Sequence, residues 1–130
     1  MTRKEAREEA FILIFEKEFN NDSLDDILQC AVEVRDIEPD DYIKTVFFGV
    51  YENTAEIDAV IAQKAVGWSL QRISKTALAV LRLALYEIRF MEDIPESVSI
   101  NEAVELCKKY ATKEDASFVN GILASVVRKQ

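Results

Sequence analysis

The segment TALAVLRLALYEI, residues 76–88, constrains the fold more than any other part of this sequence. Apolar residues cover almost the whole circumference of the helix that it predicts, which is typical of a central helix surrounded by other helices. We expect Arg82, which interrupts the apolar run, to form a structural ion pair or to reach the surface by its stem. The run is too short to span a bilayer, so we expect no contact with a membrane.

Helical spacing of apolar residues extends over most of the remaining chain. Ser23 has the pattern of an N-cap, Pro39 fits the first turn of a helix that runs to about Val66, and Gly67 fits a helix stop. The predicted helices are 3–20, one that follows Ser23, 39–66, 76–88, one that opens near 99, and a last one over about 115–129. The sequence therefore predicts an all-α protein of about six or seven helices.

Three further residues carry local expectations. Ser99 with Glu102 three residues later is a capping-box pattern, which predicts that a helix opens there. Gly121 lies inside the last predicted helix, where glycine is costly, so we expect the backbone of another helix to pass close to it. We expect Trp68 to belong to the core.

The sequence contains no histidine and only three scattered glycines. Ser-His-Asp and Cys-His nucleophile systems and His-bearing zinc sites are therefore excluded, as is a glycine-rich phosphate loop. Cys30 and Cys107 have no metal-ligand spacing, and we expect both to be buried in a reducing cytosol. The charged residues at the start do not form a secretory signal. We expect a cytoplasmic protein that is not an enzyme and uses no cofactor or metal.

The net charge of −8 at first disfavours nucleic acid as a partner, because phosphate contacts dominate that affinity. The charge is unevenly distributed, however. Residues 22–41 hold eight acidic side chains against Arg35 alone, so the rest of the chain is near −1. The sequence therefore allows a local basic surface on an acidic protein.

Three basic residues gather near the start of the first predicted helix. At about 100° per residue, Arg3, Lys4 and Arg7 fall within one arc of roughly 100°. Cations near a helix N-terminus are mildly unfavourable to the helix dipole, which favours a role in binding. A solvated helix face with mixed charges is the alternative. We expect Arg7 to be exposed.

A second basic group closes the helix that contains INEAVEL. Lys108 and Lys109 precede Tyr110, and cations beside an aromatic ring suit single-stranded RNA, since phosphates need the charge and an unstacked base can lie on the ring. Lysines in a last helical turn are also ordinary complements of the helix dipole, and Tyr110 as a cap of the core is the alternative. We expect Lys108 to be exposed.

Several segments, in order along essentially the whole chain, resemble the NusB family. They are RKEAREEAFILIFE, YIKTVFFGVYENTAEID, WSLQRI followed by AVLRLALYEI, PESVSINEAVELCKKYA and FVNGIL. One such segment is weak evidence, whereas the ordered set is highly specific.

The resemblance implies two helical sub-bundles in one compact domain, at about 1–67 and 68–130, and a function in transcription antitermination. It implies binding of boxA RNA, a single-stranded site, together with NusE, the ribosomal protein S ten, which docks on the C-terminal helices. The complex joins RNA polymerase, and some members pair as homodimers. The candidate RNA contacts, with residues 111–117 as a loop, are Arg3, Lys4, Arg7, Lys108, Lys109, Tyr110, Lys113, Ser117, Phe118 and Asn120.

The chain departs from the family pattern at three places. Glu5 lies within the basic N-terminal cluster, and Ser117 replaces a common lysine, so we expect weak RNA binding by the chain alone. Ala77 and Leu78 stand where members usually carry an acidic and then a basic residue. This third departure changes the surface that the resemblance implies for NusE.

The alternative function is a helical protein–protein adaptor that has lost RNA binding, with the acidic segment 22–41 as its working surface. An enzyme enters by analogy only, because related helical domains precede some RNA cytosine methyltransferases. A chain of 130 residues has no room for the methyl-donor domain of such an enzyme.

Overall fold

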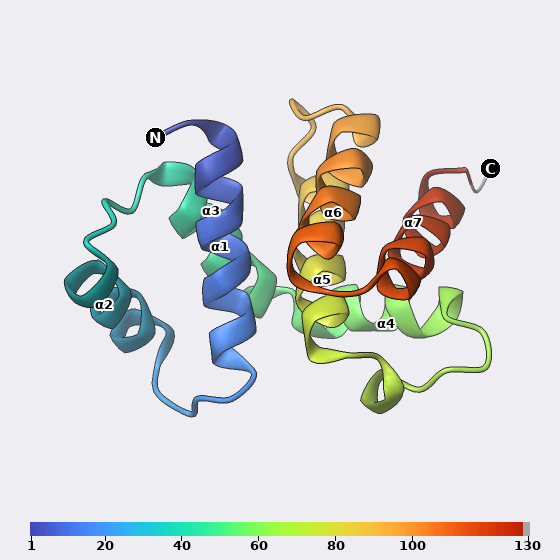
Figure 1. Cartoon of the computed structure of the whole chain (residues 1–130), viewed down its shortest axis with the longest axis horizontal. Coiled ribbons are helices and arrows are strands. Elements are labelled where there is room, and N and C mark those ends of the chain that lie inside the picture. Colours follow the sequence, from blue (N-terminus) through green and yellow to red (C-terminus); the bar gives the residue numbers. More distant parts are fainter. Residues whose placement is uncertain (129–130) are drawn as a thin grey trace.

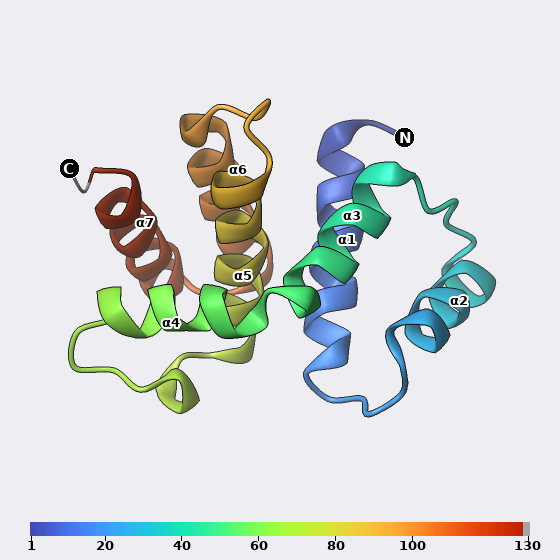
Figure 2. The same ribbon diagram turned by 180° about the vertical axis from the view of Figure 1, so that it is seen from behind.

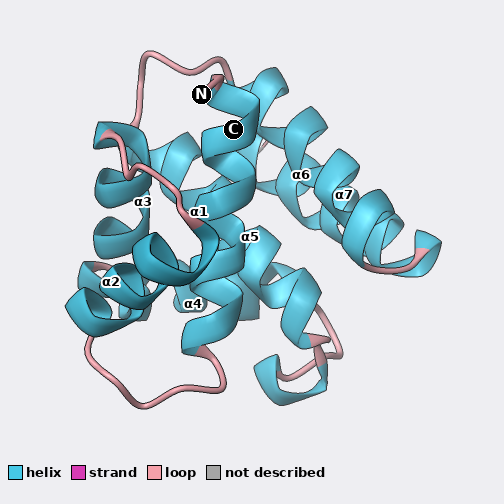
Figure 3. Cartoon of the chain, turned by 60° about the vertical axis from the view of Figure 1, so that its left-hand side comes forward, coloured by secondary structure: helices cyan, strands magenta, loops and turns pink. Residues whose placement is uncertain are grey.

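The computed structural model describes residues 1–128 and contains helices and loops, with no strand in that range (Figure 1 and Figure 3). The helices are α1 (Arg3–Lys17), α2 (Leu24–Arg35), α3 (Asp41–Glu52), α4 (Thr54–Lys64), the short 3-10 helix η1 (Leu70–Arg72), α5 (Lys75–Phe90), α6 (Glu96–Tyr110) and α7 (Lys113–Val127). The predicted all-α class is therefore confirmed. Within the described residues, no helix is both long and apolar enough to cross a membrane.

Helix α5 lies at the centre, as its sequence predicts. It packs against α1, α3, α4, α6 and α7, and Figure 2 shows α4 lying across one side of it. Its residues 77–85 are all buried. Arg82 within this run is 2.9 Å from Asp58 of α4 and 2.9 Å from Glu18 after α1. These contacts confirm the predicted structural ion pair.

The long helix predicted over 39–66 is two helices, so that prediction was wrong. α3 ends at Glu52 and α4 begins at Thr54. The Nδ2 of Asn53 donates to the carbonyl of Gly49 at 2.8 Å, and the Oγ1 of Thr54 donates to the carbonyl of Val50 at 2.9 Å. Side chains that hydrogen-bond to carbonyls of the preceding turn compete with the backbone hydrogen bonds of the helix. The chain therefore bends between α3 and α4.

The bend separates two groups of helices (Figure 1 and Figure 2). Helices α1, α2 and α3 form one group and α4 to α7 the other, while α5 also contacts α1 and α3. Because α4 packs against α5 and α7, we propose that the boundary between the two sub-bundles lies near Asn53 rather than at residues 67–68.

Short polar residues cap the helices, though not always those expected. Ser23 caps α2 as predicted, since its Oγ accepts a backbone N–H of the first turn at 3.1 Å. Asp40 caps α3, so Pro39 precedes that helix instead of occupying its first turn. α6 begins already at Glu96, so Ser99 lies inside it and the predicted capping box is wrong.

Helix α7 begins earlier than predicted. Its N-cap is Thr112, whose Oγ1 accepts the backbone N–H of Asp115 at 3.0 Å, and its first residue is Lys113. The predicted loop 111–117 is therefore mostly the first turn and a half of a helix, because a threonine cap followed by acidic residues stabilises a helix start. The predicted end at Lys129 lies outside the described residues.

The expectation for Gly67 is confirmed, whereas those for Gly121 and Trp68 are wrong. Gly67 follows α4 with a φ of +84°, as expected of a helix stop. A Cβ on Gly121 would meet nothing within 4 Å, so the predicted close approach of another helix there is wrong. At Gly49 a Cβ would collide with the ring of Tyr86, so the close contact there is with a side chain of α5. Trp68 is 49% exposed and does not belong to the core.

Candidate nucleic-acid interface

The two predicted basic groups meet where the N-terminal half of α1 lies beside α6 (Figure 1). The Nζ of Lys4 is 3.0 Å from Oε1 of Glu102, and the Nζ of Lys109 is 2.6 Å from Oε2 of Glu8. These partners are 98 and 101 positions apart in the sequence. The fold therefore brings Lys4 of one group and Lys109 of the other to the same side of α6, and each lysine is paired with a carboxylate.

Arg7 differs from its basic neighbours because it is buried. Its side chain is 5% exposed, its Nε donates to Oε2 of Glu87 at 2.8 Å, and its Nη1 is 3.8 Å from Glu102. The expectation that Arg7 is exposed is therefore wrong. The physical reason is Glu87, a fully buried carboxylate of α5, which requires a cationic partner to be tolerated inside the protein.

Glu87 is the acceptor of a buried network that joins α1, α3, α5 and α6. Three groups donate hydrogen bonds to its carboxylate: the guanidinium of Arg7, the hydroxyl of Tyr42 and, at 2.7 Å, the Oγ of Ser99. Burial opposes the charged form of Arg7, but the hydrogen bond and charge of Glu87 outweigh burial and raise the pKa of Arg7. Burial, reinforced by the charge of Glu87, raises the pKa of Tyr42, which keeps its proton as a donor. The network holds four helices together.

Tyr110 and Lys109 share one acceptor at the C-terminal end of α6. The hydroxyl of Tyr110 donates to Glu8, and its ring lies 5.1 Å from the ring of Phe11. The hydrogen bonds from Lys109 and then from Tyr110 lower the pKa of Glu8. The Glu8 hydrogen bond in turn raises the pKa of Lys109. Both ions are therefore fully charged at neutral pH.

Arg3 and Lys108 present more of their charge to solvent. The guanidinium of Arg3 lies over the ring of Tyr42, 4.6 Å from its centroid. Lys108 is exposed as predicted, and its Nζ is 3.6 Å from Glu105 of the same helix. Exposed pairs of this kind contribute little to stability, so an anionic ligand can replace the carboxylate at small cost.

The first half of α7 supplies the remaining predicted residues. Lys113, Ser117 and Asn120 are exposed, and Phe118 is half-buried. The ring of Phe118 meets that of Trp68 edge-on, with centroids 5.9 Å apart.

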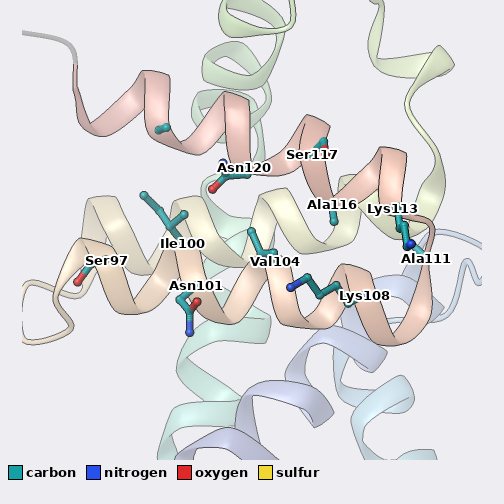
Figure 4. A pocket seen from close by; sticks show the side chains of 11 residues that line it. Ser97, Ile100, Asn101, Val104, Lys108, Ala111, Lys113, Ala116, Ser117 and Asn120 are labelled. Atoms are coloured by element: carbon teal, nitrogen blue, oxygen red, sulfur yellow. The ribbon is translucent and has the colours of Figure 1, made fainter.

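Seven of the ten predicted residues line two depressions on either side of α6, whereas Arg3, Tyr110 and Phe118 line neither. A hollow of about 140 Å³, here named the lysine–glutamate hollow, is lined by Lys4, Arg7, Glu8, Glu102, Glu105, Leu106 and Lys109. A groove of about 1010 Å³ between α6 and α7, named the α6–α7 groove, contains Lys108, Lys113, Ser117 and Asn120 in its lining (Figure 4). The groove is the larger of the two by far.

Two departures from the family pattern have a local explanation in the structure. Glu5 closes the capping box of α1, because it accepts the backbone N–H of Thr2 at 2.7 Å while Thr2 accepts that of Glu5 at 3.1 Å. Ala77 and Leu78 are buried in α5, so their own side chains do not form a partner surface.

Sequence reasoning missed the carboxylates that accompany the cations and one aromatic contact. The capping box of Thr2 and Glu5 could have been predicted, because the two residues have the same three-residue spacing as Ser99 and Glu102. A weaker indication of the buried ion pair is that Glu87 is the one acidic residue within the apolar segment 76–88. The cation–π contact of Arg72 with Trp68, 5.5 Å from the ring centroid, had no signal in the spacing.

The cysteines offer no metal site. Cys107 is buried as predicted, and burial raises the pKa of its thiol to about 12. Cys30 is exposed on α2, so the prediction that it is buried was wrong. Over residues 1–128, no three cysteine, aspartate or glutamate side chains are grouped to hold a metal ion.

The fold and these surfaces define a small all-helical binding protein with basic side chains on three neighbouring helices. The sequence profile of the NusB family matches residues 4–128. The transcription antitermination protein NusB of Ruminiclostridium cellulolyticum is 44% identical, over 97% of this chain and 88% of its own. That of Acetivibrio thermocellus is 46% identical, over 98% and 90%. The chain therefore belongs to the NusB family of transcription antitermination proteins.

Solved structures agree with this assignment. T. maritima NusB has a TM-score of 0.87 at 34% identity and covers 100% of this chain and 93% of its own. A structure of the antitermination factors NusB and NusE in complex with dsRNA has a TM-score of 0.88 at 26% identity, over 98% and 97%.

Proposed function

We propose that the chain is a transcription antitermination factor that binds boxA-type single-stranded RNA together with NusE, the ribosomal protein S ten. The observation that carries the proposal is the gathering of cations along α6 and its neighbours on a chain of net charge −8. Lys4 and Lys109 lie on the side of α1, and Lys108 and Lys113 on the side of α7. Tyr110 contacts Glu8 and Phe11 of α1. The relative solved with NusE and dsRNA supports NusE and RNA as partners.

The carboxylates beside these lysines set the expected strength of binding. RNA phosphates must replace Glu8, Glu102 and Glu105, each of which lies within 4 Å of a basic side chain. We therefore expect weak, strongly salt-dependent binding by the chain alone. If about three phosphates are neutralised, log K falls with a slope of about −2 against log salt concentration.

An aromatic surface on α1 is the proposed docking site for NusE. Phe19, two residues beyond the end of α1, is 65% exposed, and its ring is 5.1 Å from that of half-buried Phe15. The ring of Phe11, which is buried, lies 6.3 Å from that of Phe15. Next to them a hollow of about 400 Å³ is lined by Phe11, Ile12, Phe15, Thr76 and Tyr110. Exposed apolar patches of this kind mark protein contacts. The proposed site therefore includes α1 besides the C-terminal helices, of which α5 and α6 supply Thr76 and Tyr110, and Tyr110 lies at the border between protein and RNA.

The same proposal includes the setting in which the chain works. It acts in the cytoplasm by binding rather than by catalysis, without a cofactor, as part of an antitermination complex of RNA polymerase. Pairing as a homodimer stays a prediction.

Fluorescence anisotropy of labelled boxA RNA tests the proposal. Titrations with this chain, with and without ribosomal protein S ten, are repeated at several salt concentrations and with a scrambled RNA. We expect weak binding alone and tighter, boxA-selective binding with the ribosomal protein. Equal affinity for boxA and scrambled RNA in both settings would contradict the proposal.

Two lysine variants locate the interface. Lys108→Ala is expected to weaken RNA binding with an unchanged thermal midpoint, because Lys108 is exposed. Lys44→Ala on α3 is the matched control, an exposed lysine away from α6, and is expected to bind as the unaltered chain does. Equal effects of the two would argue for unspecific charge attraction.

A further inference from the structure

We propose that the α6–α7 groove holds part of the same RNA strand, so that bound RNA passes over the end of α6 and continues between α6 and α7. This inference rests on the proposed function and extends it to residues outside the predicted set. They are Asn101, Val104 and Ile100 of α6, which line the groove toward the N-terminal half of that helix.

Charge is the first argument for an RNA occupant. Among residues 1–128, Lys108 and Lys113 are the only charged side chains in the lining of the groove, and no aspartate or glutamate of that range lines it. The lysine–glutamate hollow has three carboxylates in its lining, and the whole chain has a net charge of −8. Glu105, which lines the hollow, lies 3.6 Å from Lys108. The lining of the groove itself carries positive charge only, which is complementary to phosphate.

The groove also offers the two kinds of surface that an unstacked nucleotide needs. Figure 4 shows Ile100 and Val104 of α6 and Ala116 and Asn120 of α7 facing one another across it. The half-buried aliphatic side chains provide an apolar floor for a base or a ribose. The amide of Asn120 has both donors and acceptors, which suits the edge of a base.

Size decides which side of α6 receives a base. A volume of about 1010 Å³ is at the upper end of the range for pockets that enclose small organic ligands, about 300–1,000 Å³. The lysine–glutamate hollow, at about 140 Å³, is far smaller, and ion pairs cross it. The hollow therefore contributes charge, whereas the groove has room for nucleotides.

Two substitutions test the groove without touching the predicted set. Asn101→Asp changes an exposed amide to an isosteric carboxylate, and Val104→Glu places a carboxylate on the groove floor. The matched controls are Asn21→Asp in the loop before α2 and Val34→Glu on α2, both at exposed positions. Thermal unfolding confirms that each variant folds, and Asn101→Asp keeps the test valid if Val104→Glu is destabilised.

The affinity of each variant for boxA RNA is measured in the presence of ribosomal protein S ten, and its affinity for that protein is measured without RNA. We expect Asn101→Asp and Val104→Glu to weaken RNA binding by about fivefold or more, the loss of roughly one base contact. The controls and all protein affinities are expected to be unchanged.

Two results would overturn the groove assignment. One is wild-type RNA affinity in both groove variants, which shows that the strand does not enter. The other is weakened binding of the ribosomal protein in the absence of RNA, which assigns the groove to a protein. A wild-type chain that does not distinguish boxA from scrambled RNA refutes the proposed function itself, so the two failures are distinguishable.

Discussion

Replacing Arg7 by alanine is expected to destabilise the fold, and RNA affinity is expected to fall only as a consequence. The substitution leaves Glu87, which is fully buried, without the cation 2.8 Å away. Breaking a buried pair by removing one partner costs about 3–5 kcal/mol. Tyr42 and Ser99 still donate to the carboxylate, so the cost should lie toward the lower part of this range.

The cost converts into a large change of the thermal midpoint. Globular proteins gain about 2.1 cal/mol/K of unfolding entropy per residue, so for 130 residues the midpoint should fall by about 11–18 °C. Thermal and urea unfolding followed by far-UV circular dichroism at neutral pH measure it. Lys4→Ala is the control, because the side chain of Lys4 is 68% exposed in its pair with Glu102, and it should cost less than about 1 kcal/mol.

A double variant separates charge from packing. Arg7→Met with Glu87→Gln removes both charges and keeps an acceptor for Tyr42 and Ser99, so it should be more stable than Arg7→Met alone. If Arg7→Ala unfolds within about 3 °C of the unaltered chain and still loses boxA affinity, the buried-pair reasoning is refuted and Arg7 contacts RNA directly.

Three further outcomes are expected. Glu8→Gln should raise RNA affinity a few-fold in anisotropy titrations, because it frees Lys109 from its carboxylate; lower affinity would contradict this. In the native protein a thiol reagent should modify Cys30 at once and Cys107 only after unfolding, which mass spectrometry of the labelled chain checks. Burial raises the pKa of Tyr51 from 10.0 to about 12, so the folded state retains a proton that the unfolded chain releases. Stability measured in urea should therefore fall as pH rises from 10 through 12, and less steeply in Tyr51→Phe.

Local patterns predicted most of the helices because their causes are local. The all-round apolar residues of α5 required a central position, and Ser23 capped α2 by a bond to its own first turn. The errors in helix ends also have local causes. Asn53 bonds back to Gly49 and breaks the expected long helix, and Thr112 starts α7 before the expected residue.

The candidate site was predicted less completely than the fold. Residue type alone grouped Arg7 with Arg3 and Lys4, although the structure buries Arg7 and leaves the other two exposed. Helical spacing also gave no sign that Glu8 would reach Lys109, because the two are 101 positions apart.

The sequence by itself determined that this chain is helical, that α5 is its centre, and that it belongs to the NusB family, since periodicity, caps and family motifs are properties of neighbouring residues. Only the tertiary structure decided which cations meet solvent and which meet carboxylates. A buried acid such as Glu87 requires a cationic partner. The fold supplies Arg7, which is 80 positions away in the sequence. The same packing separated the small lysine–glutamate hollow from the larger α6–α7 groove, because α6 lies between the two depressions.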